Sequence, residues 1–268
     1  MHNGMDPEEL YTILQVKKKR EKNFVLCGDE KNYCDVLLTT DSIVAHGLGI
    51  ANQPERCMNL LRYSLLANKF ITKFVYGGEV NGHVNGTYRT IVLTKNILKF
   101  IEQLTHLNSL KLDDVYINGT AHMYLESRDC LFKHRIESLT LKNMLIHPWI
   151  SKLISPNLRN LTVKKLNFTR AHLIFNAIFK SKNMLNEVDL EIIDLETVCG
   201  AKYLLSQLSR QTEKMFITFT MKRLTTQKLL LLASYIKRWK NIVSLTLSTL
   251  SSSSLREFIH FTMVFDKF

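Results

Sequence analysis

The sequence predicts an α/β fold in which short parallel strands form a curved sheet on the inside and helices lie on the outside. Three observations support this prediction. A nine-residue pattern of large apolar residues occurs six times from residue 107 onward. Within each copy, apolar and polar residues alternate with the period of a β-strand. Between the copies lie stretches in which apolar residues recur three and four positions apart, as on one face of a helix.

The repeated pattern is L-x-x-L-x-L-x-x-L, in which other large apolar residues replace some of the leucines. Its copies begin at Leu107, Ile136, Leu158, Leu185, Phe216 and Ile242. The first copy, LNSLKLDDV, places Leu110 and Leu112 on one side of a short strand. Because neither such a strand nor its helix can bury its apolar side alone, successive units must stack on one another.

The stretches between the copies predict the outer helices. Ala171–Phe179 and Lys228–Trp239 each place their apolar residues on one stripe of a helix. We also expect a helix over Ser254–Val264, as a cap on the last unit.

The pattern over residues 104–268 resembles the leucine-rich repeat family, in particular the longer repeats of ribonuclease-inhibitor-like and F-box-protein-like members. The resemblance implies a solenoid with helices on its convex side. The chain departs from the family at the ninth position, where the family usually has Asn or Cys. The residues found there are Val115, Met144, Leu166, Ile193, Leu224 and Leu250. We therefore expect the turn after each strand to be built differently. Ordinary buried strands of another α/β fold are the alternative to a solenoid.

Residues 1–103 are expected to form a mainly helical N-terminal domain or cap, and residues 104–268 about six repeats. Met5–Gln15 predicts a first helix, since Asp6 can cap it and Pro7 suits its first turn. The basic run Lys17–Lys22 fits either a nuclear localisation signal or a solvated helix end.

Two segments of this region resemble a BTB/POZ domain. Cys34–Ala51 reads as a strand, a tight turn at Asp41-Ser42, a second strand and the start of a helix. Phe70–Val80 is similar to the family's helix that ends in FxYTGE. The resemblance implies an N-terminal domain that dimerises or binds a cullin-type scaffold.

Two alternatives remain open for the same region. Ile71–Tyr76 also fits the start of a repeat strand. Residues 1–100 would then be an irregular first repeat with a polar-faced cap. The segment DPEELYTIL, which starts at Asp6, resembles the start of an F-box.

The sequence contains no motif of known catalytic or metal-binding chemistry. It lacks HExxH, a P-loop, GxGxxG and GxSxG, and its five cysteines include no CxxC pair. We therefore expect no catalytic residue, no cofactor and no metal. The chain does not open with a charged region followed by an apolar run, and it has no run of about 18 apolar residues. We expect an intracellular protein, cytoplasmic or nuclear, without a membrane partner.

The polar positions between the core leucines are the candidate site, because solenoids commonly bind partners on the concave sheet. Lys142 and Lys164 would form a basic stretch beside an acidic strand. The candidate partner-binding residues are Lys111, Asp113, Lys142, Lys164, Glu187, Asp189, Glu191 and Lys222.

These features predict a non-enzymatic protein–protein interaction module whose acidic strand selects a basic patch on its partner. If the BTB/POZ resemblance is included, the module would be a substrate-recognition adaptor of a ubiquitin ligase. The alternative starts from the formal net charge of +12. Most of this excess lies on the presumed helices and loops, so a nuclear or RNA-associated protein using a basic convex surface is the second hypothesis.

Overall fold

The structure is a computed structural model, and it divides into two compact units, Met1–Arg128 and Asp129–Phe268. The residues that it describes are 24–27, 35–39, 41–46, 58–59, 61–62, 64, 70–78, 91–129, 131, 135–181, 184–193, 198–210, 212–221, 226–236, 238–249 and 259–264.

The sheet of the first unit combines antiparallel and parallel strands. Its strands are β1 (Phe24–Cys27), β2 (Asp35–Leu38), β3 (Ser42–His46), β4 (Lys73–Gly77) and β6 (Ser109–Asp113). The pairs β1–β2 and β2–β3 are antiparallel, whereas β3–β4 and β4–β6 are parallel. A small parallel pair joins β5 (Ile91–Leu93) to β7 (Val115–Ile117).

Two helices of this unit begin at side-chain caps. Helix α4 (Lys95–Gln103) starts after Thr94, whose side chain accepts a hydrogen bond from the amide of Ile97. Helix α5 (Gly119–Glu126) starts after Asn118, whose Oδ1 accepts from the amide of Ala121 at 2.9 Å. The buried face of α4 includes Phe100, whose ring contacts that of Phe74 in β4 at a centroid distance of 5.7 Å. Each cap therefore sets the start of a helix, and in α4 the apolar face packs on the sheet.

Some of the sequence predictions for residues 1–103 can be compared with the part of this region that the structure describes. The hairpin at Asp41-Ser42 is present, as strands β2 and β3. The helix expected to begin near Ala45-His46 does not begin there, because both residues belong to β3. The helix expected in Phe70–Val80 is wrong for residues 73–77, because they form strand β4. In β4, Phe74 and Tyr76 align with Leu110 and Leu112 of β6, and all four side chains are buried. Met5–Gln15, Lys17–Lys22 and the F-box-like segment lie outside the described residues.

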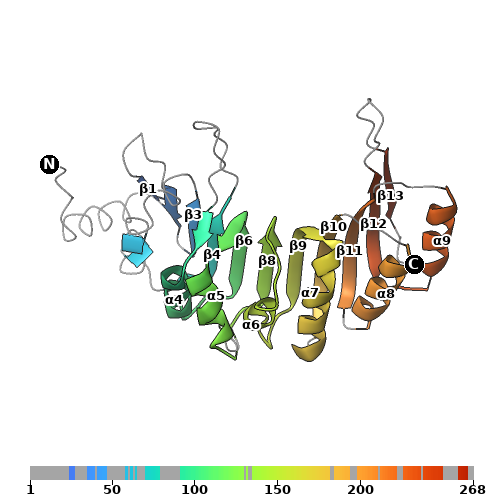
Figure 1. Ribbon diagram of the computed structural model, residues 1–268. Helices are drawn as coiled ribbons and strands as arrows, with labels where there is room; N and C mark the ends of the chain where they lie inside the picture. Colours follow the sequence, from blue (N-terminus) through green and yellow to red (C-terminus); the bar gives the residue numbers. More distant parts are fainter. Residues whose placement is uncertain are drawn as a thin grey trace. The chain divides into compact units, whose positions relative to one another are not determined.

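The second unit contains the parallel strands that the sequence predicts, with a helix in each described connection. The strands are β8 (Ser138–Lys142), β9 (Asn160–Asn167), β10 (Leu185–Ile193), β11 (Thr212–Met221) and β12 (Ile242–Thr249). The helices are α6 (Ile150–Leu153), α7 (Phe168–Ser181), α8 (Val198–Leu208) and α9 (Thr226–Ile236). Each strand pairs in parallel with the next, and Figure 1 shows α7 and α8 lying over one face of the sheet. The mixed α/β fold with a mostly parallel sheet is confirmed.

Apolar residues alternate along these strands, and one set is fully buried. The buried pairs are Leu139/Leu141, Leu161/Val163, Val188/Leu190, Met215/Ile217 and Leu245/Leu247. The strand register aligns each pair with the next from β8 to β11. Between β11 and β12 the register shifts, and Leu245 aligns with Ile217 and Leu247 with Phe219. The helices bury Ile174 and Leu205, and Trp149 lies just before α6 at 1% exposure. The core is therefore one layer of apolar side chains between the sheet and the helices.

Two sequence expectations for this unit are wrong. Phe216 was expected at the first apolar position of its repeat, but Thr212 is the buried residue at the start of β11 and Phe216 is only half-buried. Residues 259–264 are not helical: they form β13 (Ile259–Val264), antiparallel to β12.

Three residues near the carboxyl ends of β6, β8 and β9 have a left-handed backbone conformation. Asp114, Asn143 and Lys165 have φ angles of 52°, 50° and 55°. Each stands at the eighth position of its repeat, directly before the apolar residue at the ninth. Asp114 and Asn143 directly follow β6 and β8, whereas Lys165 lies within β9.

Candidate interaction face

The second unit has one sheet face that alternates with the buried side chains and that we name the open face. Its described residues are exposed or half-buried. They are Ser138, Thr140, Lys142, Asn160, Thr162, Lys164, Glu187, Asp189, Glu191, Lys214, Phe216, Thr218, Thr220, Ser244 and Thr246. The face is therefore polar, with a single aromatic side chain among the residues that the structure describes.

Strand register arranges these side chains in rows across the sheet. One row runs through Thr140, Thr162, Asp189, Phe216 and Ser244, since each is aligned with the next on the neighbouring strand. Aligned residues on adjacent strands lie close enough for their side chains to interact. Phe216 therefore lies between an acidic residue and a hydroxyl residue.

Lys164 and Asp189 form an ion pair across β9 and β10. The Nζ atom of Lys164 lies 2.7 Å from Oδ1 and 2.6 Å from Oδ2 of Asp189, and the side chains are 31% and 28% exposed. A pair of this exposure stabilises a fold by no more than about 1 kcal/mol. Its larger effect is on the site, because it neutralises the central carboxylate of the acidic strand.

Glu187 and Glu191 differ from Asp189 in their ion-pair contacts. Neither makes an ion pair with a residue that the structure describes. They lie two positions on either side of Asp189, with Glu187 aligned to Lys214 and Glu191 to Thr218. Because Lys214 and Thr218 lie two residues on either side of Phe216 on β11, both glutamates occupy positions diagonal to Phe216 in the strand register.

The remaining candidate residues do not all belong to this face. Lys142 is half-buried at the end of β8, aligned with Lys164. Lys111 and Asp113 lie in the first unit, where Lys111 Nζ is 3.1 Å from Asp113 Oδ2. The Asp113 side chain is only 8% exposed, so it does not present a charge to a partner as the sequence predicted. Lys222 lies outside the described residues.

A polar cluster of described residues lies between α4 and α5. The Tyr124 hydroxyl donates to Glu102 Oε2 and accepts from Arg128 Nη2 at 2.8 Å. Burial raises the pKa of Tyr124, the bond and charge of Glu102 raise it further, and Arg128 opposes them. Arg128 also lies over the Tyr124 ring, with Cζ 4.9 Å from its centroid. The partners are mutually satisfied, so the cluster joins two helices rather than offering groups to a ligand.

No group of three or more His, Cys, Asp or Glu in the described segments could hold a metal ion. In the same segments, no helix is both long and apolar enough to span a membrane.

Sequence reasoning missed Phe216 as a surface residue, and the signal that could have found it is Thr212. TEKMFITFT, starting at Thr212, fits the repeat pattern four residues earlier than the predicted copy, with a threonine in place of the first leucine. In that frame Met215 and Ile217 are the core pair and Phe216 points away from the core, as observed.

No family model matches the chain, and comparison with curated proteins and with solved structures also finds no match.

Proposed function

We propose that this protein is a non-enzymatic protein–protein interaction module of the leucine-rich repeat type that binds a basic segment of a partner on its open face. The observation that carries the proposal is the position of Phe216 beside two glutamates without ion-pair partners among the described residues. The parallel strands with intervening helices support the repeat reading, and the polar open face supplies the binding surface.

The chemistry of these three side chains suits arginine on the partner. A guanidinium stacks on an aromatic ring and forms paired hydrogen bonds with a carboxylate. Aromatic residues at the centre of an interface are also the ones that contribute most to binding. Glu187 and Glu191 would steer the basic segment, and Phe216 would form the contact that holds it.

The test is capture of partner proteins by the purified chain with both glutamates reversed, Glu187→Lys with Glu191→Lys. We expect capture to fall at least about tenfold, because two attractive charges become repulsive at the centre of the face. A matched control, Glu137→Lys with Glu213→Lys, changes the net charge equally at two exposed residues outside the open face. Capture that survives the first pair of substitutions, or falls equally with the control pair, would contradict the proposal.

The role of a ubiquitin ligase adaptor is not part of the proposal. It depends on the two segments that resemble a BTB/POZ domain, and only the hairpin β2–β3 agrees with that resemblance. Phe70–Val80 contains a strand where the resemblance implies a helix.

The alternative of nucleic-acid binding would use the helix side of the second unit. Large apolar side chains are exposed there beside the cations, such as Phe179 at 58% and Tyr203 at 63% exposure. A phosphate backbone contacts cations and hydrogen-bond donors and offers little to such side chains. We therefore do not propose nucleic acid as the ligand of that side.

A further inference from the structure

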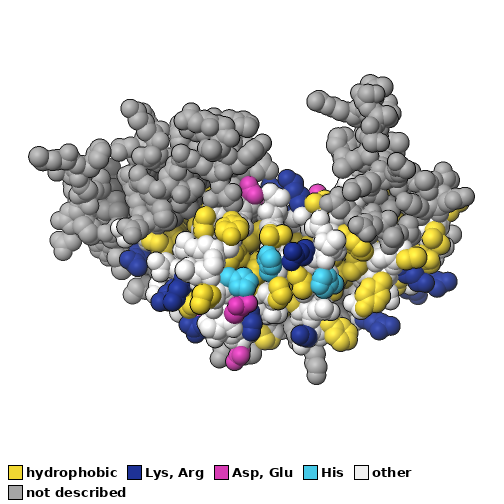
Figure 2. Space-filling model, in the orientation of Figure 1, with side chains coloured by type: hydrophobic (Ala, Val, Ile, Leu, Met, Phe, Trp, Pro, Cys, Tyr) yellow, Lys and Arg dark blue, Asp and Glu magenta, His cyan; other side chains and the backbone are white. Residues whose placement is uncertain are grey.

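The helices of the second unit contain basic residues and no acidic ones. No Asp or Glu occurs within α6, α7, α8 or α9 as the structure bounds them. Lys180 in α7 and Lys202 in α8 are exposed, whereas Lys152 and Arg170 are half-buried. Figure 2 shows Lys and Arg side chains among hydrophobic ones where these helices lie. The electrostatic potential of this side favours an anionic partner.

Large apolar side chains are exposed on the three longer helices of this unit, α7, α8 and α9. They are Phe179 in α7, Tyr203 in α8, and Leu230 and Leu231 in α9, at 58%, 63%, 67% and 42% exposure. Helix α8 contacts both α7 and α9, so the exposed residues follow one another across three neighbouring helices. We name these four residues with Lys180 and Lys202 the helix-side surface.

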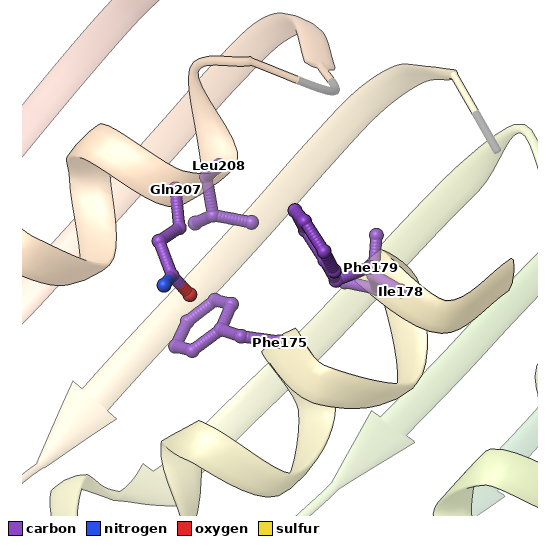
Figure 3. A pocket seen from close by; sticks show the side chains of 5 residues that line it. All are labelled: Phe175, Ile178, Phe179, Gln207 and Leu208. Carbon is purple, nitrogen blue, oxygen red and sulfur yellow. The ribbon is translucent and has the colours of Figure 1, made fainter. Parts of the chain in front are cut away.

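A shallow apolar depression lies within this surface, between α7 and α8. Its lining residues are Phe175, Ile178, Phe179, Gln207 and Leu208 (Figure 3). Phe175, Ile178 and Leu208 are almost fully buried, so they form an apolar floor. Gln207 is the one polar lining residue, and its Nε2 donates to the Tyr203 hydroxyl at 2.6 Å. The depression is suited to the tip of one apolar side chain.

We propose that the helix-side surface binds an acidic amphipathic helix of a partner protein. Packed helices lie about 8–10 Å apart, and an α-helix rises about 1.5 Å per residue. A helix that crosses α7, α8 and α9 therefore brings apolar residues seven positions apart over successive exposed side chains. Helix-in-groove recognition uses such regularly spaced anchors.

The two lysines of the helix-side surface determine which charge the partner helix must carry. Acidic residues on the flanks of its apolar stripe would meet Lys180 and Lys202. Lys202 is positioned for this at the junction of two helices, because its Nζ lies over the Tyr235 ring of α9 at 4.5 Å from the centroid. A basic amphipathic helix would be repelled from the same surface.

The test uses a synthetic helix-forming peptide with leucines on one face and glutamates on the other, titrated into the full chain by fluorescence anisotropy. We expect a dissociation constant on the order of 10–100 µM, as for a small transient interface, and weaker binding at higher salt. Phe179→Ser with Leu230→Ser should weaken it at least about tenfold, and so should Lys180→Glu with Lys202→Glu. Met123→Ser, at a residue 71% exposed in α5, is the matched control and should leave the affinity unchanged.

Three results would overturn the proposal. The first is no binding of the peptide, or equal binding of a peptide with lysines in place of the glutamates. The second is an affinity that the Phe179 and Leu230 substitutions leave unchanged in a folded chain, checked by circular dichroism. The third is tighter binding to vesicles of anionic lipid or to an oligonucleotide, lost with the same substitutions. Glu187→Lys with Glu191→Lys should leave peptide binding intact, so failure here is distinct from failure of the open face.

Discussion

At the scale of single residues, three positions have a left-handed backbone conformation: Asp114, Asn143 and Lys165. Their residue types differ in how readily they adopt a positive φ angle. Asp114 and Asn143 belong to residue types that adopt positive φ most readily, whereas Lys165 does not. The turn at Asn143 also has a strand-to-strand contact, since its amide donates to the carbonyl of Lys164 at 3.0 Å. Strain should therefore be greatest at Lys165.

We expect the Lys165→Gly variant to be more stable than the original chain. Glycine adopts a φ angle of 55° without the clash of a Cβ atom, so the free energy of unfolding should rise by about 0.5–1 kcal/mol in a urea titration. Lys214→Gly, at an exposed residue within β11, should lower it by about 0.5–1 kcal/mol. Equal losses for both variants would show that the backbone at Lys165 carries no strain.

At the scale of secondary-structure elements, the sequence predicts five of the repeat strands well, because large apolar residues alternate cleanly in β6, β8, β9, β10 and β12. It places β11 in the wrong frame, since Thr212 replaces the leucine that marks the first position. It also predicts a helix where β13 forms, although Ile259, Phe261 and Met263 alternate. Pairing with β12 stabilises a strand there, and such pairing is not visible in local spacing.

Gly77 is the glycine on which the junction of two elements depends. Its φ is +101°, and a Cβ atom there would lie 2.0 Å from the carbonyl oxygen of Asp113 at the end of β6. Gly78 donates to that same oxygen at 2.7 Å, so the backbone of β6 cannot move away freely.

We expect Gly77→Ala to lower the free energy of unfolding by at least about 2 kcal/mol, through a strained φ and a backbone clash. Gly119→Ala is the matched control, because nothing lies within 4 Å of its Cβ position and it stands in the first turn of α5. That variant should be neutral or slightly more stable. If Gly77→Ala and Gly119→Ala change the thermal unfolding temperature equally, the close approach of the Gly77 backbone to the Asp113 carbonyl is contradicted.

At the scale of the whole molecule, the sequence predicts which polar residues belong to the candidate site. It does not predict which of them contact one another. The polar positions of β9 and β10 were predicted as a basic stretch beside an acidic strand. Their register turns Lys164 and Asp189 into an internal ion pair and leaves two glutamates beside Phe216. Charge counting cannot distinguish a carboxylate that is already neutralised from one that is available. Lys111 and Asp113 were grouped with this site, although they lie in the other compact unit.

The two compact units can be followed separately during unfolding, because the chain has two tryptophans and both are in the second unit. Trp149 is 1% exposed and Trp239 is half-buried, so tryptophan fluorescence reports the unfolding of residues 129–268. Compact units often unfold as separate cooperative bodies. In the full chain, Gly77→Ala should therefore move part of the far-ultraviolet circular dichroism transition to lower urea and leave the fluorescence midpoint unchanged. A fluorescence midpoint that moves together with the circular dichroism would show that the two units unfold as one.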